Sequence, residues 1–429
     1  MSEIRHDLMQ EYKHFEFLVR IKADLLAKGI RVNQNVGKRK DFNRKQIHLY
    51  QHCATLHPID IPEDLVLYSG SMLIPEIIMT KFRYNPDSDW QMDDENGYKL
   101  RNDRTGVEIP VEPTPQTGFD QHFIGELPLS SIVQKLGTDV AGVVLSNWCF
   151  YFQNNHECRF CEIFPTYQSQ KTFNKAQKPI EQVVEGLKLA FQIDSHLKHV
   201  LITSGNMISY DHTVREYIKI GEGIKELKKK NINFQAILMP PENFLLMDEM
   251  RNVGFHRVCM NLEVFDPQLF EIITPGKAAY GYQRLFEALD YASKVFDIAY
   301  SSIVYGIQSL SPDLDVTKWD PAKENQKALA GVDGLLEKKI IPLFTVYHTS
   351  ERNAIGLIRI DGEALFAFTS EYGQKVFSSG IIAESQNSIS FDSTSPNDLI
   401  NDGYSLAKYQ KEIADLETFS MEDQKVIRK

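Results

Sequence analysis

From residue 140 onward, short apolar runs alternate with longer stretches in which apolar residues recur at helical spacing. The apolar runs predict buried strands over residues 142–145, 199–203, 234–239, 256–265, 300–305 and 340–346. The stretches between them predict helices near 180–192, 213–230, 243–252, 281–296 and 321–338. Strands that alternate with helices form parallel βα units, and right-handed connections let such units curl into a barrel. The pattern therefore predicts an α/β fold, a partial (β/α)6 TIM-like barrel.

The segments on either side of these units have different patterns. Apolar residues before Gly29 recur at helical spacing, whereas residues 58–128 are rich in Pro, Gly and Asp, which predicts a helix followed by hairpins and loops. The last part begins with a predicted strand pair around 357–368 and ends in a polar helix over 396–414 that we expect to cover one end of the barrel. We therefore expect an N-terminal α+β extension over 1–139, the barrel over 140–346 and a small C-terminal extension over 347–429.

The composition narrows the functional class. Hydrophobic residues make up 42% and charged residues 24% of the 429 residues, which is typical of a globular protein in water. The net charge of −11 argues against nucleic acid as a partner, because phosphate binding needs a basic face. No apolar run reaches the roughly 18–20 residues of a membrane span, and the first residues lack an apolar signal-peptide core. With only five cysteines, this pattern predicts a protein of the reducing cytoplasm.

Three of the five cysteines are concentrated in one short segment, Cys149, Cys158 and Cys161, with the spacing C-x8-C-x2-C. The segment follows the first predicted barrel strand, and loops after barrel strands form the active face. Three thiolates can hold three corners of an iron–sulfur cube and leave the fourth iron open to a small molecule. A zinc site that adds His156 to the three cysteines is the alternative, and the loop by itself does not decide between them.

Motifs later in the chain favour the iron–sulfur cluster over the zinc site. Together with the cysteine loop, they make the chain resemble the radical S-adenosylmethionine superfamily, and within it the biotin-synthase-like barrels. Phe160 takes the aromatic position of the family's C-x3-C-x-aromatic-C loop, although the first gap here is eight residues. The catalytic subunit of Elongator, in the same superfamily, has a similarly wide gap. The segments 259–266, 272–274 and 282–285 are similar in order and spacing to the family's Asn-Leu-Asp, Ile-Ile-Thr and Tyr-Gln-Glu-Arg-Leu motifs.

The resemblance, which covers about residues 140–346, implies a [4Fe–4S] cluster on the three cysteines, with S-adenosylmethionine at its open iron. It implies reductive cleavage to a 5′-deoxyadenosyl radical, which abstracts hydrogen from a substrate that we expect to be a small molecule. An electron donor such as flavodoxin or ferredoxin is the implied partner.

The resemblance also implies cofactor contacts. Asn261 and Glu263, which share one strand face with Cys259, would bind the ribose, and Arg284 would bind the methionine carboxylate. The turn after the second strand is similar to the family's Gly-Gly-Glu turn, and the fifth strand is similar to the strand that packs against adenine. The residues implied there are Thr203, Ser204, Gly205, Asn206, Ile303 and Gly306, with Gln308 in place of the family's acid.

Several alternatives stay open at this point. Cys259 can donate a hydrogen atom to a substrate radical, but a free cysteine is more often a buried apolar residue, as we expect for Cys53. His348, Glu351 and Arg352, after the sixth strand, could contact substrate or be solvated. The rival functions are a tRNA-modifying radical enzyme, which the acidic charge opposes, and a zinc-binding interaction protein.

Overall fold

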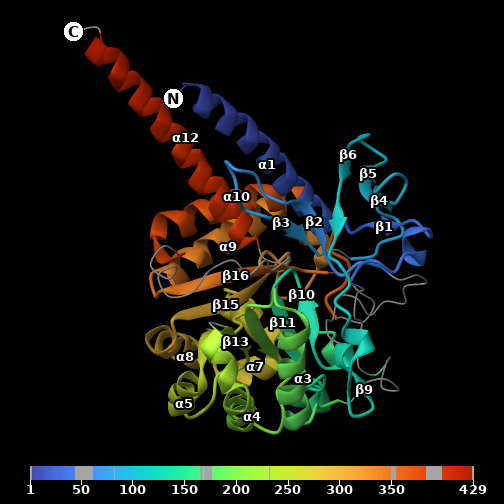
Figure 1. The fold of residues 1–429 in the computed structure, drawn as a ribbon. Helices are drawn as coiled ribbons and strands as arrows, with labels where there is room; N and C mark the ends of the chain where they lie inside the picture. Colours follow the sequence, from blue (N-terminus) through green and yellow to red (C-terminus); the bar gives the residue numbers. More distant parts are fainter. Residues whose placement is uncertain are drawn as a thin grey trace.

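A curled sheet of seven strands, in the order β10-β11-β12-β13-β14-β15-β16, forms the centre of the computed structural model (Figure 1). The structure describes residues 2–43, 61–81, 83–164, 168, 176–230, 232–348, 354–382 and 399–427. The first strand is antiparallel to the second, and all later neighbours are parallel. The strands are β10 (Gln134–Leu136), β11 (Val140–Val144), β12 (His199–Thr203), β13 (Asn233–Ile237), β14 (Phe255–Cys259), β15 (Ile298–Tyr305) and β16 (Ile340–Val346).

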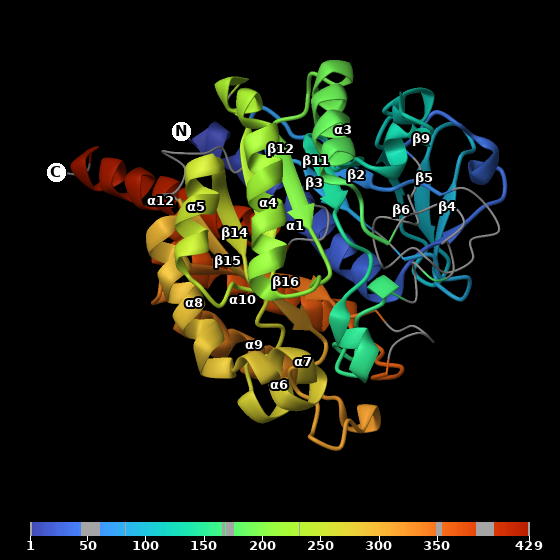
Figure 2. The same ribbon diagram turned by 90° about the horizontal axis from the view of Figure 1, so that it is seen from below.

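Helices connect consecutive parallel strands and cover the outer face of the sheet, as α4 and α5 show in Figure 2. Local signals fix where they begin: the Ser209 side chain accepts from the backbone N–H of His212 at the start of α4, and Asp320 caps α9 with Pro321 in its first turn. The fold therefore confirms the predicted partial barrel. The helices are α3 (Ile180–Ile193), α4 (Tyr210–Gly223), α5 (Leu245–Val253), α6 (Pro267–Ile273), α7 (Pro275–Tyr280), α8 (Tyr282–Val295) and α9 (Pro321–Leu336).

The N-terminal part consists of one long helix and small sheets, as the pattern predicts. Helix α1 (Ser2–Lys28) ends before Gly29, whose φ of 74° suits a glycine after a helix. One sheet has the order β1-β4-β5-β6, another has the order β3-β2-β7, and β8 pairs with β9. These strands are β1 (Arg31–Val32), β2 (Leu65–Tyr68), β3 (Ile78–Thr80), β4 (Trp90–Asp93), β5 (Lys99–Asn102), β6 (Glu108–Pro110), β7 (Glu112–Pro113), β8 (Phe123–Ile124) and β9 (Leu127–Pro128).

The strand pair predicted around 357–368 is wrong, because helix α10 (Gly362–Ser379) occupies most of this segment. Asp361 caps the helix by accepting from the backbone N–H of Ala364. The buried side chains of Leu365, Thr369 and Tyr372 recur at helical spacing. Burial alternates over 357–360 as it does in a strand, but this pattern is confined to the segment before the cap.

Helix α12 (Ile400–Ile427) lies beside α1 and α10, and α1 and α12 extend together away from the barrel (Figure 1). A buried ion pair, Lys22 Nζ to Asp402 Oδ2 at 2.6 Å, joins α1 to α12. In the described part of the chain, no helix combines the length and the apolar character that a membrane span requires.

Helices α10 and α12 approach closely at two glycines. A Cβ atom on Gly373 would lie 2.0 Å from the carbonyl carbon of Gly403, so an added methyl group would force the two backbones apart. Both glycines are buried. The absence of side chains at this point therefore sets the distance between the two helices.

We expect Gly373→Ala to lower the free energy of unfolding by about 1–3 kcal/mol, the typical cost of overpacking a core. Urea unfolding of the purified protein measures this change. Gly334→Ala is the matched control, because Gly334 is also helical but has no atom within 4 Å of the added carbon. That variant is expected to be neutral or slightly more stable, since alanine favours helix. Equal behaviour of the two variants would contradict the packing argument.

Candidate active site

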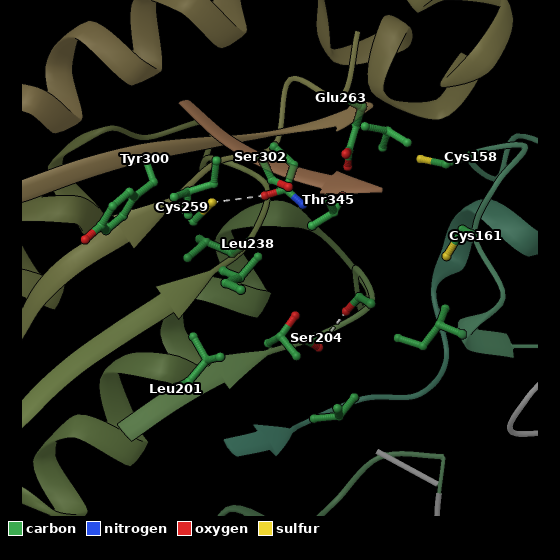
Figure 3. Close-up of a pocket in the computed structure, with 18 of the residues that line it drawn as sticks. Cys158, Cys161, Leu201, Ser204, Leu238, Cys259, Glu263, Tyr300, Ser302 and Thr345 are labelled. Atoms are coloured by element: carbon green, nitrogen blue, oxygen red, sulfur yellow. Dashed lines mark hydrogen bonds between the residues drawn. The ribbon is translucent and has the colours of Figure 1, made fainter. Parts of the chain in front are cut away.

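A cavity of about 360 Å³ lies on the inner side of the barrel strands and extends from the cysteine loop to the start of α12 (Figure 3). Most residues predicted from the sequence line it, although they come from three separate parts of the chain. Those that line it are Cys149, Cys158, Phe160, Cys161, Thr203, Ser204, Gly205, Asn206, Cys259, Asn261 and Glu263.

Arg284, Ile303 and Gly306 do not line this cavity. The Arg284 guanidinium donates to the carbonyl of Glu242 at 2.9 Å and lies over two aromatic rings outside the cavity. Strand alternation directs the neighbours Ser302 and Val304 toward the cavity in place of Ile303. The backbone N–H of Gly306 donates to Glu324 at 2.6 Å. The roles predicted for these three residues stay predictions.

Backbone contacts to the turn after β12 fix the first half of the cysteine loop. The N–H of Phe150 donates to the carbonyl of Asn206 at 2.9 Å, and the N–H of Gly205 donates to that of Ser146 at 2.9 Å. A Cβ on Gly205 would lie 2.4 Å from the Trp148 carbonyl oxygen and 2.9 Å from the Cys149 Cβ. Only glycine permits this approach, so the turn positions the first cysteine.

The segment after β14 holds the second half of the loop. Arg159 donates from its backbone N–H to the carbonyl of Ile273 at 2.9 Å and from Nε to that of Ile272 at 2.6 Å. The N–H of Gly276 donates to the carbonyl of His156 at 2.9 Å. In this chain, the Ile-Ile-Thr motif that carried part of the resemblance thus anchors the cysteine loop to the barrel.

The three thiols face one cavity, as Figure 3 shows for Cys158 and Cys161. Burial raises the pKa of all three, that of Cys161 to about 12, so without a metal they are protonated thiols. Soft sulfur ligands suit iron–sulfur clusters and zinc. His156, however, is exposed and does not line the cavity, and the described residues contain no group of three ligands gathered for a single ion. The donor set fits a cluster of several irons, which spreads its thiolate ligands around a cube.

Glu263 has a backbone conformation that is rare for its residue type. Its φ is 68°, in the left-handed region, and the side chain faces the cavity with only 5% exposure. Strand β15 holds this conformation: the N–H of Glu263 donates to the Ser302 carbonyl at 2.9 Å, and its carbonyl accepts from Val304 N–H at 3.0 Å. The Gln308 amide also donates to the Glu263 carbonyl, at 2.9 Å. Strain of this kind is concentrated at functional sites.

Lys277 is a cavity residue that the sequence reasoning missed. Its Nζ lies 2.6 Å from Glu263 Oε1 and donates to the Asn261 carbonyl at 2.9 Å. Burial lowers the pKa of Lys277, but the negative charge of Glu263 and the nearby Cys158 raise it more, so the balance lies above the usual lysine pKa. Among the described residues that line the cavity, Lys277 is the sole lysine or arginine. A lysine in the first turn of a short helix is normally solvated, so neither its residue type nor its position marks it as a cavity residue.

The remaining sequence candidates divide between the cavity and undescribed segments. Cys259 is 1% exposed, lines the cavity and points its Sγ toward the Asn261 side-chain oxygen at 3.3 Å (Figure 3). His348 also lines the cavity. Glu351, Arg352 and Cys53 lie outside the described residues.

Comparison with known proteins gives one relative in sequence. The chain is 22% identical over 235 residues to the bacteriochlorophyllide c C-7(1)-hydroxylase of Chlorobaculum limnaeum, an enzyme of the radical S-adenosylmethionine superfamily. The match covers 51% of this chain and 55% of the hydroxylase, so the chain spans about half the length of that relative. No family model matches the chain. The similarity confirms the resemblance at the level of the superfamily, while the variant cysteine motif stays a prediction.

Among solved structures, the chain is similar to the [FeFe]-hydrogenase maturase HydG, with a TM-score of 0.41 and 14% identity over 61% of this chain and 53% of that one. For HydG from Carboxydothermus hydrogenoformans the TM-score is 0.42 and the identity is 14%, over 67% of this chain and 68% of that one. For methylornithine synthase (PylB) the TM-score is 0.40 and the identity is 12%, over 62% of this chain and 69% of that one.

We expect Lys277→Met to lower the free energy of unfolding by about 3–5 kcal/mol, because it leaves the buried Glu263 carboxylate without its partner. Adding Glu263→Gln should restore much of this loss, since the remaining amide carries no charge. Urea unfolding of the metal-free protein measures both. Lys294→Met is the control, because Lys294 pairs with Asp290 on the surface with 70% exposure. A double variant no more stable than the single one would contradict a coupled pair.

Proposed function

We propose that this chain is a radical S-adenosylmethionine enzyme in which Cys149, Cys158 and Cys161 hold a [4Fe–4S] cluster. The observation that carries the proposal is the meeting of the three thiols, the Thr203–Asn206 turn, Asn261 and Glu263 on one cavity. The chemistry that the cluster and S-adenosylmethionine supply when bound is reductive cleavage to a 5′-deoxyadenosyl radical, which abstracts a substrate hydrogen.

The chain's own residues are suited to bind the rest of S-adenosylmethionine. Asn261 and Glu263 offer oxygen acceptors for the two ribose hydroxyls, at a place where water is largely excluded. The turn at Gly205 presents backbone carbonyls beside the cysteine loop, where an amino group can donate to them. The left-handed backbone of Glu263 fixes the direction of its carboxylate, so little ordering is left to the moment of binding.

Lys277 is the side chain that we assign to the methionine carboxylate. A carboxylate entering this cavity needs a cation, and Lys277 is the one lysine or arginine that the described lining provides. Arg284, which the resemblance implied for this role, is engaged with the Glu242 carbonyl outside the cavity. Lys277 also lies next to Glu263, so the two residues would place the ribose and the carboxylate ends of one molecule.

The cavity size favours a small substrate. The hydroxylase relative acts on a bacteriochlorophyllide, as its name states. Here the cavity of about 360 Å³ lies at the lower end of the range for sites that bind small molecules, and a tetrapyrrole ring is a large ligand for it.

The first test is iron content and cofactor cleavage. Protein reconstituted without oxygen is expected to hold about four irons per chain, as a single cube requires, and to cleave S-adenosylmethionine to 5′-deoxyadenosine and methionine when reduced. The variant with alanine at all three loop cysteines should lose both, while Cys259→Ala keeps the iron. Iron analysis, absorbance spectra and chromatography of the products measure these outcomes.

Two results would remove the proposal. Stoichiometric zinc without iron would favour the zinc-binding alternative. Formation of S-adenosylhomocysteine alone, without 5′-deoxyadenosine, would require a methyl-transfer enzyme instead.

The second test separates Lys277 from Arg284. Lys277→Ala is expected to weaken S-adenosylmethionine binding about ten- to a hundredfold, because a hydrogen bond to a charged group contributes about 1.5–3 kcal/mol. Binding of decarboxylated S-adenosylmethionine should change little, since it lacks the carboxylate. Calorimetry on iron-loaded protein measures both ligands, with Arg284→Ala as the control expected to bind normally. Equal losses for the two ligands would mean that Lys277 acts only by holding Glu263, and a loss confined to Arg284→Ala would return the role to that residue.

A further inference from the structure

The cavity continues beyond Cys259 to the amino ends of the barrel strands, where Ile400 and Asn401 in the first turn of α12 line it. We call this end the inner chamber and define it by six residues. Figure 3 shows two of them, Leu201 and Tyr300, at the side of the view away from Cys158 and Cys161. The six are Val140, His199, Leu201, Gln235, Tyr300 and Asn401.

His199 lines this chamber, and its ring carries a buried polar atom without a hydrogen-bond partner. It is 5% exposed, and it lies on the face of β12 that also directs Leu201 and Thr203 into the cavity. Its Nδ1 lies 3.3 Å from the side-chain nitrogen of Asn233, but its Nε2 has no hydrogen-bond partner. The nearest carboxylate oxygen, on Asp139, is 3.6 Å from Nε2, beyond hydrogen-bond distance. A buried nitrogen left in this way gains free energy from a ligand that pairs with it.

The imidazole is also uncharged. Burial lowers the pKa of His199 to about 3, and the positive charges of Arg257 and Lys198 act in the same direction. A neutral imidazole and an amide, that of Gln235, in one cavity lining can pair with carbonyl, amide or hydroxyl groups.

The charged side chains of the cavity lie at its other end. Among the described residues that line it, the carboxylates and the ammonium group belong to Glu162, Glu263 and Lys277, beside the cysteine loop. Arg257 and Asp139 lie near His199 but outside the lining, and their charges are opposite. A ligand with a full charge in the inner chamber would therefore lose its hydration without a facing counter-charge, which is costly.

We propose that the inner chamber is the substrate site and that it takes an uncharged molecule whose carbonyl, amide or hydroxyl group bonds to His199 and Gln235. Its role as a substrate site rests on the proposed function, but its preference for a neutral ligand does not. The apolar side chains of Val140 and Leu201 would contact the carbon frame of this molecule.

Three probes of nearly equal size and different charge test this preference: benzamide, benzoate and benzamidine. Their binding to the full chain is measured by ligand-observed NMR at millimolar concentration before iron is added, so that paramagnetism does not broaden the signals. Benzamide is expected to bind at least about tenfold more tightly than benzoate or benzamidine, a difference of about 1.4 kcal/mol. His199→Leu and Gln235→Leu should each weaken benzamide at least fivefold, and His199→Gln, which keeps a neutral polar group, should retain most of the binding.

His196→Leu is the matched control, because His196 is exposed on the loop before β12. Thermal unfolding confirms that each variant is folded. The proposal is wrong if benzamide does not bind, if either charged probe binds as well as benzamide and loses that binding in His199→Leu, or if the leucine variants bind benzamide normally. A protein that fails to bind iron would contradict the proposed radical function but not the preference of the inner chamber for a neutral ligand. The two proposals can therefore be contradicted separately.

Discussion

Parallel pairing of the barrel strands is the constraint on which the rest of this structure depends. Because β11 to β16 run in the same direction, the segments that follow them meet at one edge. The cysteine loop, the Gly205 turn and the Asn261–Glu263 segment are thereby brought together from distant parts of the chain. Strand alternation then selects which side chains reach the interior, and this is why Ser302 and Val304 line the cavity while Ile303 packs into the core.

Close backbone approach turns this arrangement into a fixed site. The cysteine loop has no regular sheet or long helix to hold it, and it is instead pinned on one side by the turn at Gly205 and on the other by residues 272–276. Both supports consist largely of backbone hydrogen bonds. The three cysteine side chains of the loop are therefore left to face the cavity.

Charge is distributed unevenly along the cavity, and this is its main chemical property. At the cysteine end, a buried ion pair between Lys277 and Glu263 lies beside three thiols. At the far end, a neutral histidine and an amide line the cavity together with the first turn of α12. The charged end suits an ionic cofactor and the neutral end suits an uncharged ligand, because burial magnifies the cost of any unpaired charge.

The sequence by itself determined the repeating units and the chemistry of the loop. Strands such as 199–203 and 340–346 were predicted with their observed bounds, because a buried strand between two helices needs a continuous apolar run. Local patterns failed at 357–368, where a short, mostly apolar segment precedes a helix that is recognised only over its full length. Only the tertiary structure decided that Lys277 faces the cavity, that Arg284 does not, and that Glu263 takes a left-handed backbone. These outcomes depend on which distant strand or loop lies opposite each residue. Residue type and spacing do not determine those neighbours.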